Sequence, residues 1–255
     1  MSQPRITIIT ITYNSEKTLA RAIDSIICQE YPNLEYIIVD GGSNDNTVEI
    51  IKSYGDRITK WISEPDKGIS NAFNKGIHMA TGDVIGIINS DDGLELGALQ
   101  KVADAYEENV DVYRGNVLLW KEDSNTQVVE IPSMHFRYVG SNKISHQSTF
   151  VAKKAYMRFG LYDESCKYVM DYDLLLRYER AGAKFKYIDE TLAFYSLGGL
   201  TFTKFTKKRM DEIIRVLKQN GASHFHVLMY ILYQLSKELI KKIVPKETLM
   251  RIMNR

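Results

Sequence analysis

Four strand-like runs, each followed by residues at helical spacing, constrain the fold of this chain more than any other feature. The runs cover residues 6–12, 35–40, 58–63 and 84–88, and short connections join each to the helix expected after it. Strands that alternate with helices in this way form a parallel sheet with helices on both faces. We therefore predict a doubly wound, mostly parallel α/β sheet for the first 110 residues.

The pattern changes after residue 111. A hairpin is predicted over 112–120 and 126–131, and short strands over 148–151, 185–188 and 192–195. Helices are predicted over 153–159, 172–181, 204–220 and 225–243. We predict one domain over 1–203, with halves at 1–110 and 111–203 and a small antiparallel region in the second half. A helical tail, residues 204–255, follows.

Charge is unevenly distributed although the net charge is only +1. The tail holds 12 Lys/Arg against 4 Asp/Glu, a net of +8, which leaves −7 for the rest. Its last predicted helix has a broad apolar face flanked by lysines, a pattern that suits the surface of an anionic membrane. A helix that docks on its own domain or on a second subunit, giving a homodimer, would look the same.

The cysteines and the termini suggest a location. Cys28 and Cys166 are far apart and lack the spacing of a zinc site, which fits a reducing compartment. The N-terminus shows no secretory signal, and no apolar run reaches the length of a membrane span. We expect a cytoplasmic protein, peripheral at the inner face of the plasma membrane if the tail binds lipid. No nucleic-acid partner is expected.

Polar side chains follow three of the predicted strands, where ligands bind in open α/β sheets. The loop after the third strand adds a carboxylate and an ammonium group. A Gly-x-Gly-x-x-Gly turn and a P-loop are both missing, so neither standard phosphate-binding loop is present. The alternative for the aspartates is an ordinary turn or helix cap. Tyr13 could stack on a base or simply pack at the end of its strand. The candidates are Thr12, Tyr13, Asn14, Asp40, Asp66, Lys67, Asn89, Asp91 and Asp92.

Two of these positions suggest specific chemistry. Asp91 and Asp92 are adjacent carboxylates, and a hard divalent cation such as Mg²⁺ or Mn²⁺ would relieve their repulsion. Asp40 could accept a hydrogen bond from the imide N–H of uracil. It could equally cap the Gly-Gly-Ser turn that follows it.

Several motifs, in order and in register, resemble the family 2 glycosyltransferases over residues 5–200. They are Thr-Ile-Thr-Tyr-Asn at 10–14, Val-Asp-Gly-Gly-Ser-Asn-Asp-Asn-Thr at 39–47, Ser-Glu-Pro-Asp-Lys-Gly-Ile at 63–69, Asn-Lys-Gly-Ile at 74–77, Ala-Thr-Gly-Asp-Val-Ile at 80–85, Asn-Ser-Asp-Asp at 89–92, His-Gln-Ser-Thr-Phe at 146–150, Asp-Tyr-Asp-Leu-Leu-Leu-Arg at 171–177 and Gly-Gly-Leu at 198–200.

The resemblance implies a GT-A fold and an inverting transfer from a nucleotide-diphosphate sugar. It implies that residues 1–110 bind the nucleotide and residues 111–203 the acceptor, a saccharide or a lipid-linked saccharide. Asp40 and the turn after the first strand would hold the nucleoside, and Asp91 and Asp92 the diphosphate and its metal ion. Asp171 matches the catalytic base, and Asp173 is the alternative for that role. His146, Asp173 and Arg177 would lie on the acceptor or diphosphate side.

The chain departs from the family pattern at two positions, and each role has an alternative. Relatives often have Asp at the position of Asn89 and Glu at that of Met170. Asp171 could instead cap the helix predicted over 172–181. His146 could be structural, and Lys67 and Arg177 could pair with nearby carboxylates. Gly-Gly at 198–199 could form a flexible loop over the donor or a plain turn.

We therefore predict a metal-dependent hexosyltransferase that uses a UDP-sugar in polysaccharide or glycolipid assembly. The competing hypothesis is a non-catalytic sugar-nucleotide-binding or scaffold protein, which Asn89 and Met170 would suit. A sugar-nucleotide pyrophosphorylase would need a glycine-rich basic loop after the first strand, and this chain has none there.

Overall fold

The structure is a computed structural model that describes residues 3–121, 126–139, 142–196 and 206–243. The strands are β1 (Ile6–Thr12), β2 (Leu34–Asp40), β3 (Lys60–Ser63), β4 (Val84–Asn89), β5 (Gly93–Leu94), β6 (Val112–Lys121), β7 (Thr126–Glu130), β8 (Thr149–Ala152) and β9 (Phe185–Ser196). The helices are α1 (Leu19–Ile27), α2 (Thr47–Ser53), α3 (Ile69–Met79), α4 (Ala98–Asp104), α5 (Lys153–Phe159), α6 (Met170–Arg180), α7 (Lys207–Gln219) and α8 (His224–Ile243), with single 3₁₀ turns η1 (Gly55–Arg57) and η2 (His146–Ser148).

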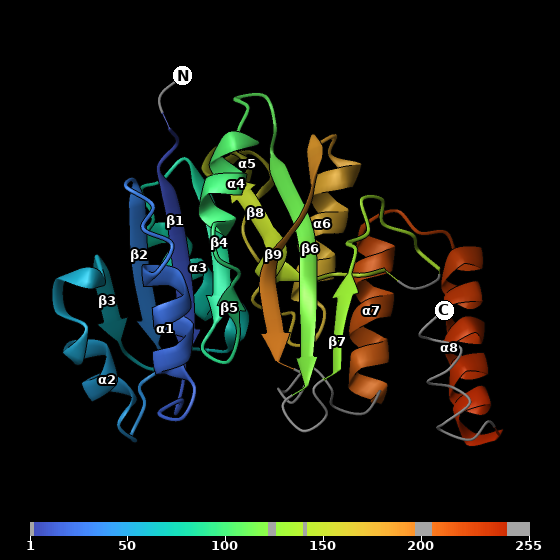
Figure 1. Cartoon of the computed structure of the whole chain (residues 1–255). Helices are drawn as coiled ribbons and strands as arrows, with labels where there is room; N and C mark the ends of the chain where they lie inside the picture. The colour runs from blue at the N-terminus through green and yellow to red at the C-terminus, as the bar shows by residue number, and fades with distance from the viewer. Residues whose placement is uncertain (1–2, 122–125, 140–141, 197–205, 244–255) are drawn as a thin grey trace.

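A single sheet organises the described chain, with strand order β3-β2-β1-β4-β8-β6-β9-β5 and β7 paired to β6 (Figure 1). The first four strands are parallel to one another. Antiparallel pairs begin at β8. The predicted mostly parallel sheet with a smaller antiparallel region is therefore confirmed.

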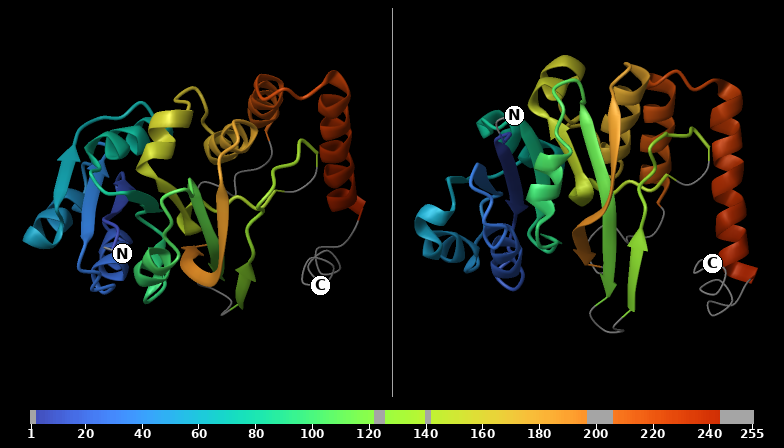
Figure 2. Two further views of the ribbon diagram at one scale, coloured as in Figure 1. Left: turned by 90° about the horizontal axis from the view of Figure 1, so that it is seen from above. Right: turned by 45° about the horizontal axis from the view of Figure 1, so that its top comes forward.

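Helices cover both faces of the sheet. Adjacent strand residues alternate between the faces, so Ile8 and Ile9 belong to different hydrophobic clusters although both are fully buried. Helices α1, α2 and α4 cover one face, and α3, α5 and α6 the other (Figures 1 and 2). This two-sided burial explains why β4 is almost wholly apolar and why β1 and β2 are rich in isoleucine and valine, whereas the edge strand β3 is largely exposed.

Two predicted elements differ from the structure. The strands expected over 185–188 and 192–195 are one strand, β9, because residues 189 and 190 bulge where the pairing with β6 shifts register. The helix expected after the fourth strand run does not follow it directly, since Gly93–Leu94 pair with β9 and α4 starts only after Gly97, whose φ is +77°.

The start of α6 corrects the capping alternative for Asp171. The helix begins at Met170 with Val169 as its N-cap, so Asp171 lies within the first turn. A residue at that position has a helical backbone and cannot be the N-cap. Its carboxylate still benefits from the positive end of the helix dipole.

The tail helices form where they were predicted. Ile213, Val216 and Leu217 of α7 are buried in the same cluster as α3, α5 and α6. Helix α8 lies beyond α7, at the end of the molecule opposite β3 and α2 (Figures 1 and 2). Within the described residues, no helix has both the length and the apolar character that crossing a membrane requires. The boundary predicted at 203/204 stays a prediction.

Candidate active site

The carboxyl ends of β1, β2 and β4 bring the predicted donor-site residues together. Thr12 pairs with Asp40, and Ile11 pairs with Asn89, so the three strand ends lie side by side. Strand β1 is flanked by β2 on one side and β4 on the other, which makes this edge the topological switch point of the sheet. Ligands of open α/β sheets bind at such a crevice.

Asp40 organises the turn that follows β2. The N–H groups of Gly42 and Ser43 donate to its Oδ2 at 3.2 and 3.0 Å, and the Ser63 hydroxyl donates at 2.6 Å. The Ser43 hydroxyl donates to Oδ1 at 2.5 Å. Asp40 is fully buried and caps the Gly-Gly-Ser turn, which was the structural alternative for this residue. A contact with a base stays a prediction.

Tyr13 and Asp66 lie on either side of Gly41. A Cβ added to Gly41 would come within 2.6 Å of Asp66 Oδ2 and 3.4 Å of Tyr13 Cδ2, so only glycine leaves these side chains in place. The Tyr13 side chain is 60% exposed. Asp66 Oδ1 accepts from Gly68 N–H at 2.8 Å, while the Lys67 side chain is exposed. An exposed ring beside a carboxylate suits a planar heterocycle with N–H donors.

Asn14 fixes the turn after β1. Its φ of +49° is a left-handed conformation that asparagine tolerates better than most residues. Its N–H donates to the Ser43 hydroxyl at 2.7 Å, and its side-chain oxygen accepts from Asn44 N–H at 3.0 Å. The two nucleoside-side turns are therefore tied to each other.

The adjacent carboxylates after β4 lie in different environments. Asp92 is fully buried, and its Oδ2 accepts from the amides of Asn89 at 3.2 Å and Gln147 at 2.7 Å. Asp91 is partly exposed, and its backbone oxygen accepts from Arg21 Nη2 at 2.9 Å. Because Asn89 supplies a donor where a carboxylate would repel, this departure from the family pattern stabilises Asp92.

His146 and Asp171 form an ion pair close to Asp91 and Asp92. His146 Nδ1 lies 3.2 Å from Asp171 Oδ2, and the two side chains are 14% and 21% exposed. Burial lowers the pKa of His146, but the charges of Asp171, Asp92 and Asp91 outweigh it, so the pKa is raised above its ordinary value. These carboxylates are thus close enough to act on one imidazole.

Several buried polar atoms at this site have no hydrogen-bond partner among the described residues. They are Thr12 Oγ1, Asn89 Oδ1, His146 Nε2 and Asp171 Oδ1. Leaving a buried polar atom without a partner costs about 1–3 kcal/mol. Their concentration at the switch point is typical of a binding site.

Asp173 and Arg177 form a separate group. Residues 171 and 173 differ by about 200° around a helix, so their side chains leave α6 on different sides. Asp173 Oδ2 accepts from Arg177 Nε at 2.9 Å, and the guanidinium also donates to the carbonyls of Phe159 and Leu161. Pairing with a nearby carboxylate was the structural alternative predicted for Arg177, and the contact with Asp173 is such a pair. A place for either residue beside the acceptor or diphosphate stays a prediction.

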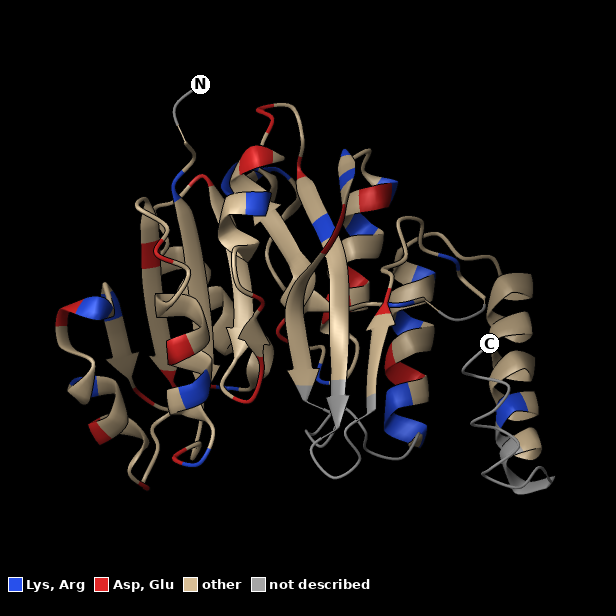
Figure 3. Cartoon of the chain, viewed as in Figure 1, with Lys and Arg blue, Asp and Glu red and all other residues tan. Residues whose placement is uncertain are grey.

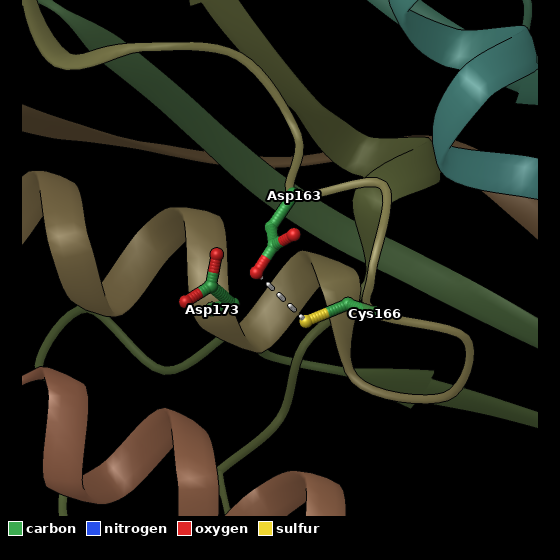
Figure 4. Close-up of side chains that lie close together, drawn as sticks. All are labelled: Asp163, Cys166 and Asp173. Atoms are coloured by element: carbon green, nitrogen blue, oxygen red, sulfur yellow. Dashed lines mark hydrogen bonds between the residues drawn. The ribbon is translucent and has the colours of Figure 1, made fainter.

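An acidic cluster beside α6 is filled by an arginine. Potential ligand atoms of Asp163, Cys166 and Asp173 lie within 4.8 Å of one another (Figure 4). Arg215 Nη1 donates to Asp163 Oδ2 at 3.0 Å, and Nη2 lies 3.2 Å from Cys166 Sγ. Burial raises the pKa of the Cys166 thiol to about 12. A protonated thiol beside a guanidinium does not suit a metal ion.

Helix α7 supports the start of α6. The Glu212 carboxylate accepts from the N–H groups of Lys167, Tyr168 and Val169 at 3.0, 2.8 and 2.9 Å. These donors precede the first turn, which carries Asp171. The tail therefore positions the candidate base.

Sequence reasoning missed Gln147 and Arg114. Gln147 was quoted within a motif but given no role, although its amide holds Asp92. Arg114 is fully buried and donates to Ser133 O, to Lys143 O and to Thr149 Oγ1. Burial lowers its pKa to about 10, and the charge of Asp171 opposes this shift. The sequence feature that could have identified Arg114 is the presence of an arginine within the mostly apolar segment that forms β6.

Comparison with known proteins agrees with this geometry. Residues 7–165 match the model of glycosyl transferase family 2. A PGL/p-HBAD biosynthesis glycosyltransferase of Mycobacterium bovis is 27% identical over 230 residues, 84% of this chain and 85% of that protein. An uncharacterised glycosyltransferase of Rickettsia typhi is 29% identical over 195 residues, and the match covers 71% of this chain and 60% of its relative.

Solved structures share the fold. S. aureus TarS 1–349 superposes with a TM-score of 0.68 at 16% identity, covering 98% of this chain and 78% of that one. The mannosyltransferase PcManGT of Pyrobaculum calidifontis gives a TM-score of 0.64 at 14% identity, over 86% and 64%. The predicted GT-A fold is thereby confirmed. Since the family model spans more than half of the chain, this protein belongs to glycosyl transferase family 2.

Proposed function

We propose that this protein transfers a sugar from a UDP-sugar to an acceptor hydroxyl with inversion, in polysaccharide or glycolipid biosynthesis. The observation that carries the proposal is the set of buried, unpartnered polar atoms at the switch point, with Asp171 among them. Its mycobacterial relative is named for PGL/p-HBAD biosynthesis, and another relative, 28% identical over 193 residues, is the chondroitin synthase of Escherichia coli.

The uridine would lie over Tyr13 and Gly41. The exposed ring offers a stacking surface, and Asp66 and Asp40 offer acceptors for the imide N–H. Asn89 Oδ1 has no hydrogen-bond partner among the described residues and would accept from a ribose hydroxyl. TarS, a structural neighbour, has been crystallised with UDP-GlcNAc, whereas PcManGT was crystallised with GDP-Man. Thermal stabilisation by UDP but not GDP, each with Mn²⁺, is the expected result.

Asp91 is the better candidate for the metal ligand. Its carboxylate is partly exposed, whereas Asp92 is buried and already accepts two amide hydrogen bonds. Carboxylate and diphosphate oxygens together are the hard donors that Mg²⁺ or Mn²⁺ prefers. The ion, when bound, would neutralise charge on the departing diphosphate. PcManGT was crystallised with Mn²⁺ as well as GDP-Man.

Asp171 would accept the proton of the acceptor hydroxyl at Oδ1, while His146 holds Oδ2. The acceptor oxygen forms a bond to the anomeric carbon as the bond from that carbon to the diphosphate oxygen breaks. A single displacement of this kind inverts the configuration. Holding both substrates in line and removing the proton supply much of the rate enhancement.

Asp171→Asn tests this assignment, with Asp173→Asn as the matched control on the other side of the same helix turn. We expect Asp171→Asn to lower kcat by about 10²–10⁴-fold with unchanged UDP binding. Asp173→Asn should lower stability through Arg177 but leave the kcat of the folded enzyme within a few-fold. If Asp173→Asn lowered kcat more than Asp171→Asn does, the catalytic base would be Asp173. Donor binding without any transfer or hydrolysis would support the non-catalytic alternative.

We place the activity at the cytoplasmic face of the plasma membrane, where a lipid-linked acceptor would be reached. A metal-dependent hexosyltransferase of this kind needs access to that acceptor but no span of its own. A homodimer formed through the tail is the competing arrangement.

A further inference from the structure

Helix α8 has two faces with different surroundings. Val227 and Tyr230 are buried in the core cluster that also contains α7, and Ile231 packs against it. The opposite face carries large apolar side chains that are 38–67% exposed. They are Phe225, Leu228, Met229, Leu232, Leu235, Leu239 and Ile240.

The exposed apolar face of α8 is broad. At 100° per residue these seven side chains span an arc of about 140°. The apolar stripe of a and d positions that pairs two helices in a coiled coil is narrower than this arc. Lys237, a charged residue of α8 whose side chain the structure describes, lies outside the arc over the ring of Tyr233. The breadth of this face fits a surface better than a second helix.

Charge indicates which surface. The tail carries +8 and the rest of the chain −7, so only the tail is attracted to an anionic layer. Lys207 and Lys208 at the start of α7 are exposed, and Figure 3 shows several Lys/Arg segments along that helix, with acidic segments between them. An apolar helix face within a basic segment is the pattern of an interfacial helix.

We propose that α8 binds the surface of an anionic membrane and lies in its plane, with the exposed apolar face in the headgroup region. Leu228, Leu232 and Leu235 are part of the contact, and Leu232 lies near the centre of the arc. The inference is independent of the donor-site assignment, because α8 supplies no residue to that site.

Flotation of the full chain with vesicles tests the proposal. We expect binding to phosphatidylcholine vesicles with 30% phosphatidylglycerol, and at least tenfold weaker partitioning onto pure phosphatidylcholine. The triple variant Leu228→Gln, Leu232→Gln, Leu235→Gln should lose partitioning by at least about 100-fold. All three side chains are at least half exposed, so folding should persist.

The matched control is Leu96→Gln with Met157→Gln, exposed apolar residues outside the tail, which should bind like the wild type. Circular dichroism and donor hydrolysis check that each variant is folded. Wild type that stays unbound, or a triple variant that binds as well as wild type, would overturn the proposal. A dimer that the triple variant converts to monomer, without vesicle binding, would replace it with a contact between two copies.

Discussion

Two adjacent carboxylates, Asp91 and Asp92, lie in different environments although the sequence presents them as a pair. Asp92 is buried and accepts two amide hydrogen bonds, whereas Asp91 is partly exposed. The sequence could not separate them, because the Gln147 amide comes from a segment more than 50 positions away. The pairing of His146 with Asp171 was equally hidden.

Asn89→Asp tests the environment of Asp92. The new carboxylate would lie where an amide 3.2 Å from Asp92 Oδ2 now donates, so we expect a loss of about 1–3 kcal/mol of stability at pH 8. Mn²⁺ with UDP should restore part of it. Urea unfolding with and without these ligands measures both effects. Asn89→Ala, which adds no charge, should lose less and recover less; equal behaviour of the two variants would refute the explanation.

At the scale of elements, the buried strands were the most predictable part of the chain. Each is rich in isoleucine, valine and other strand-forming residues, and the structure pairs β1 in parallel with both β2 and β4. The limits of β9 were not predictable, because the bulge at Asp189 and Glu190 exists only in the pairing with β6. The start of α4 was not predictable either, because it depends on the pairing of Gly93–Leu94 with β9. The first turn of α6 was missed for a similar reason, since Glu212 of α7 supplies acceptors for the N–H groups before it.

Glu35 in β2 provides a pH-dependent link between strands. Burial raises its pKa, but donors from Thr7, Thr81 and Lys60 outweigh it and lower the pKa from 4.5 to about 2. A carboxyl group whose folded pKa is depressed stabilises the fold above its unfolded pKa. That contribution, about 3 kcal/mol, is lost as pH falls from about 4.5 towards 2.

Glu35→Gln should therefore be less stable than wild type by this amount at pH 7. The gap should narrow as pH falls below about 4.5, because the wild-type carboxylate then loses its advantage. Urea midpoints measured between pH 7 and pH 3 follow the gap. Glu49→Gln is the control, since its ion pair with Lys52 is exposed. A pH-independent gap would contradict the linkage.

At the scale of the whole molecule, α7 belongs to the catalytic body and α8 lies at its margin. Val216 and Leu217 are fully buried, and Arg215 binds Asp163 of the loop before α6. By contrast, the largest side chains of α8 are mostly exposed. The sequence predicted both helices but could not assign them to different roles, because both read as basic and amphipathic.

Truncation should separate the two helices. A chain that ends at Gly221 should fold and transfer sugar at a rate within a few-fold of wild type. A chain that ends at residue 205 should be insoluble or inactive, since it exposes the partners of Ile213, Val216 and Leu217, each worth about 1.5–3 kcal/mol. Solubility, circular dichroism and activity compare them. An active chain ending at 205 would support the domain boundary predicted at 203.

The short turn η2 has a consequence for the design of chimeras. Gln147 donates to Asp92 after β4, and His146 contacts the candidate base Asp171 on α6. Two neighbouring residues therefore contact residues 1–110 and residues 111–203, respectively. Exchange of acceptor-side loops between relatives is therefore restricted to segments that leave η2 in place. A graft that crosses residues 146–147 would replace the contacts to Asp92 and to Asp171 at the same time, so the proposed donor and acceptor sides could not be exchanged independently.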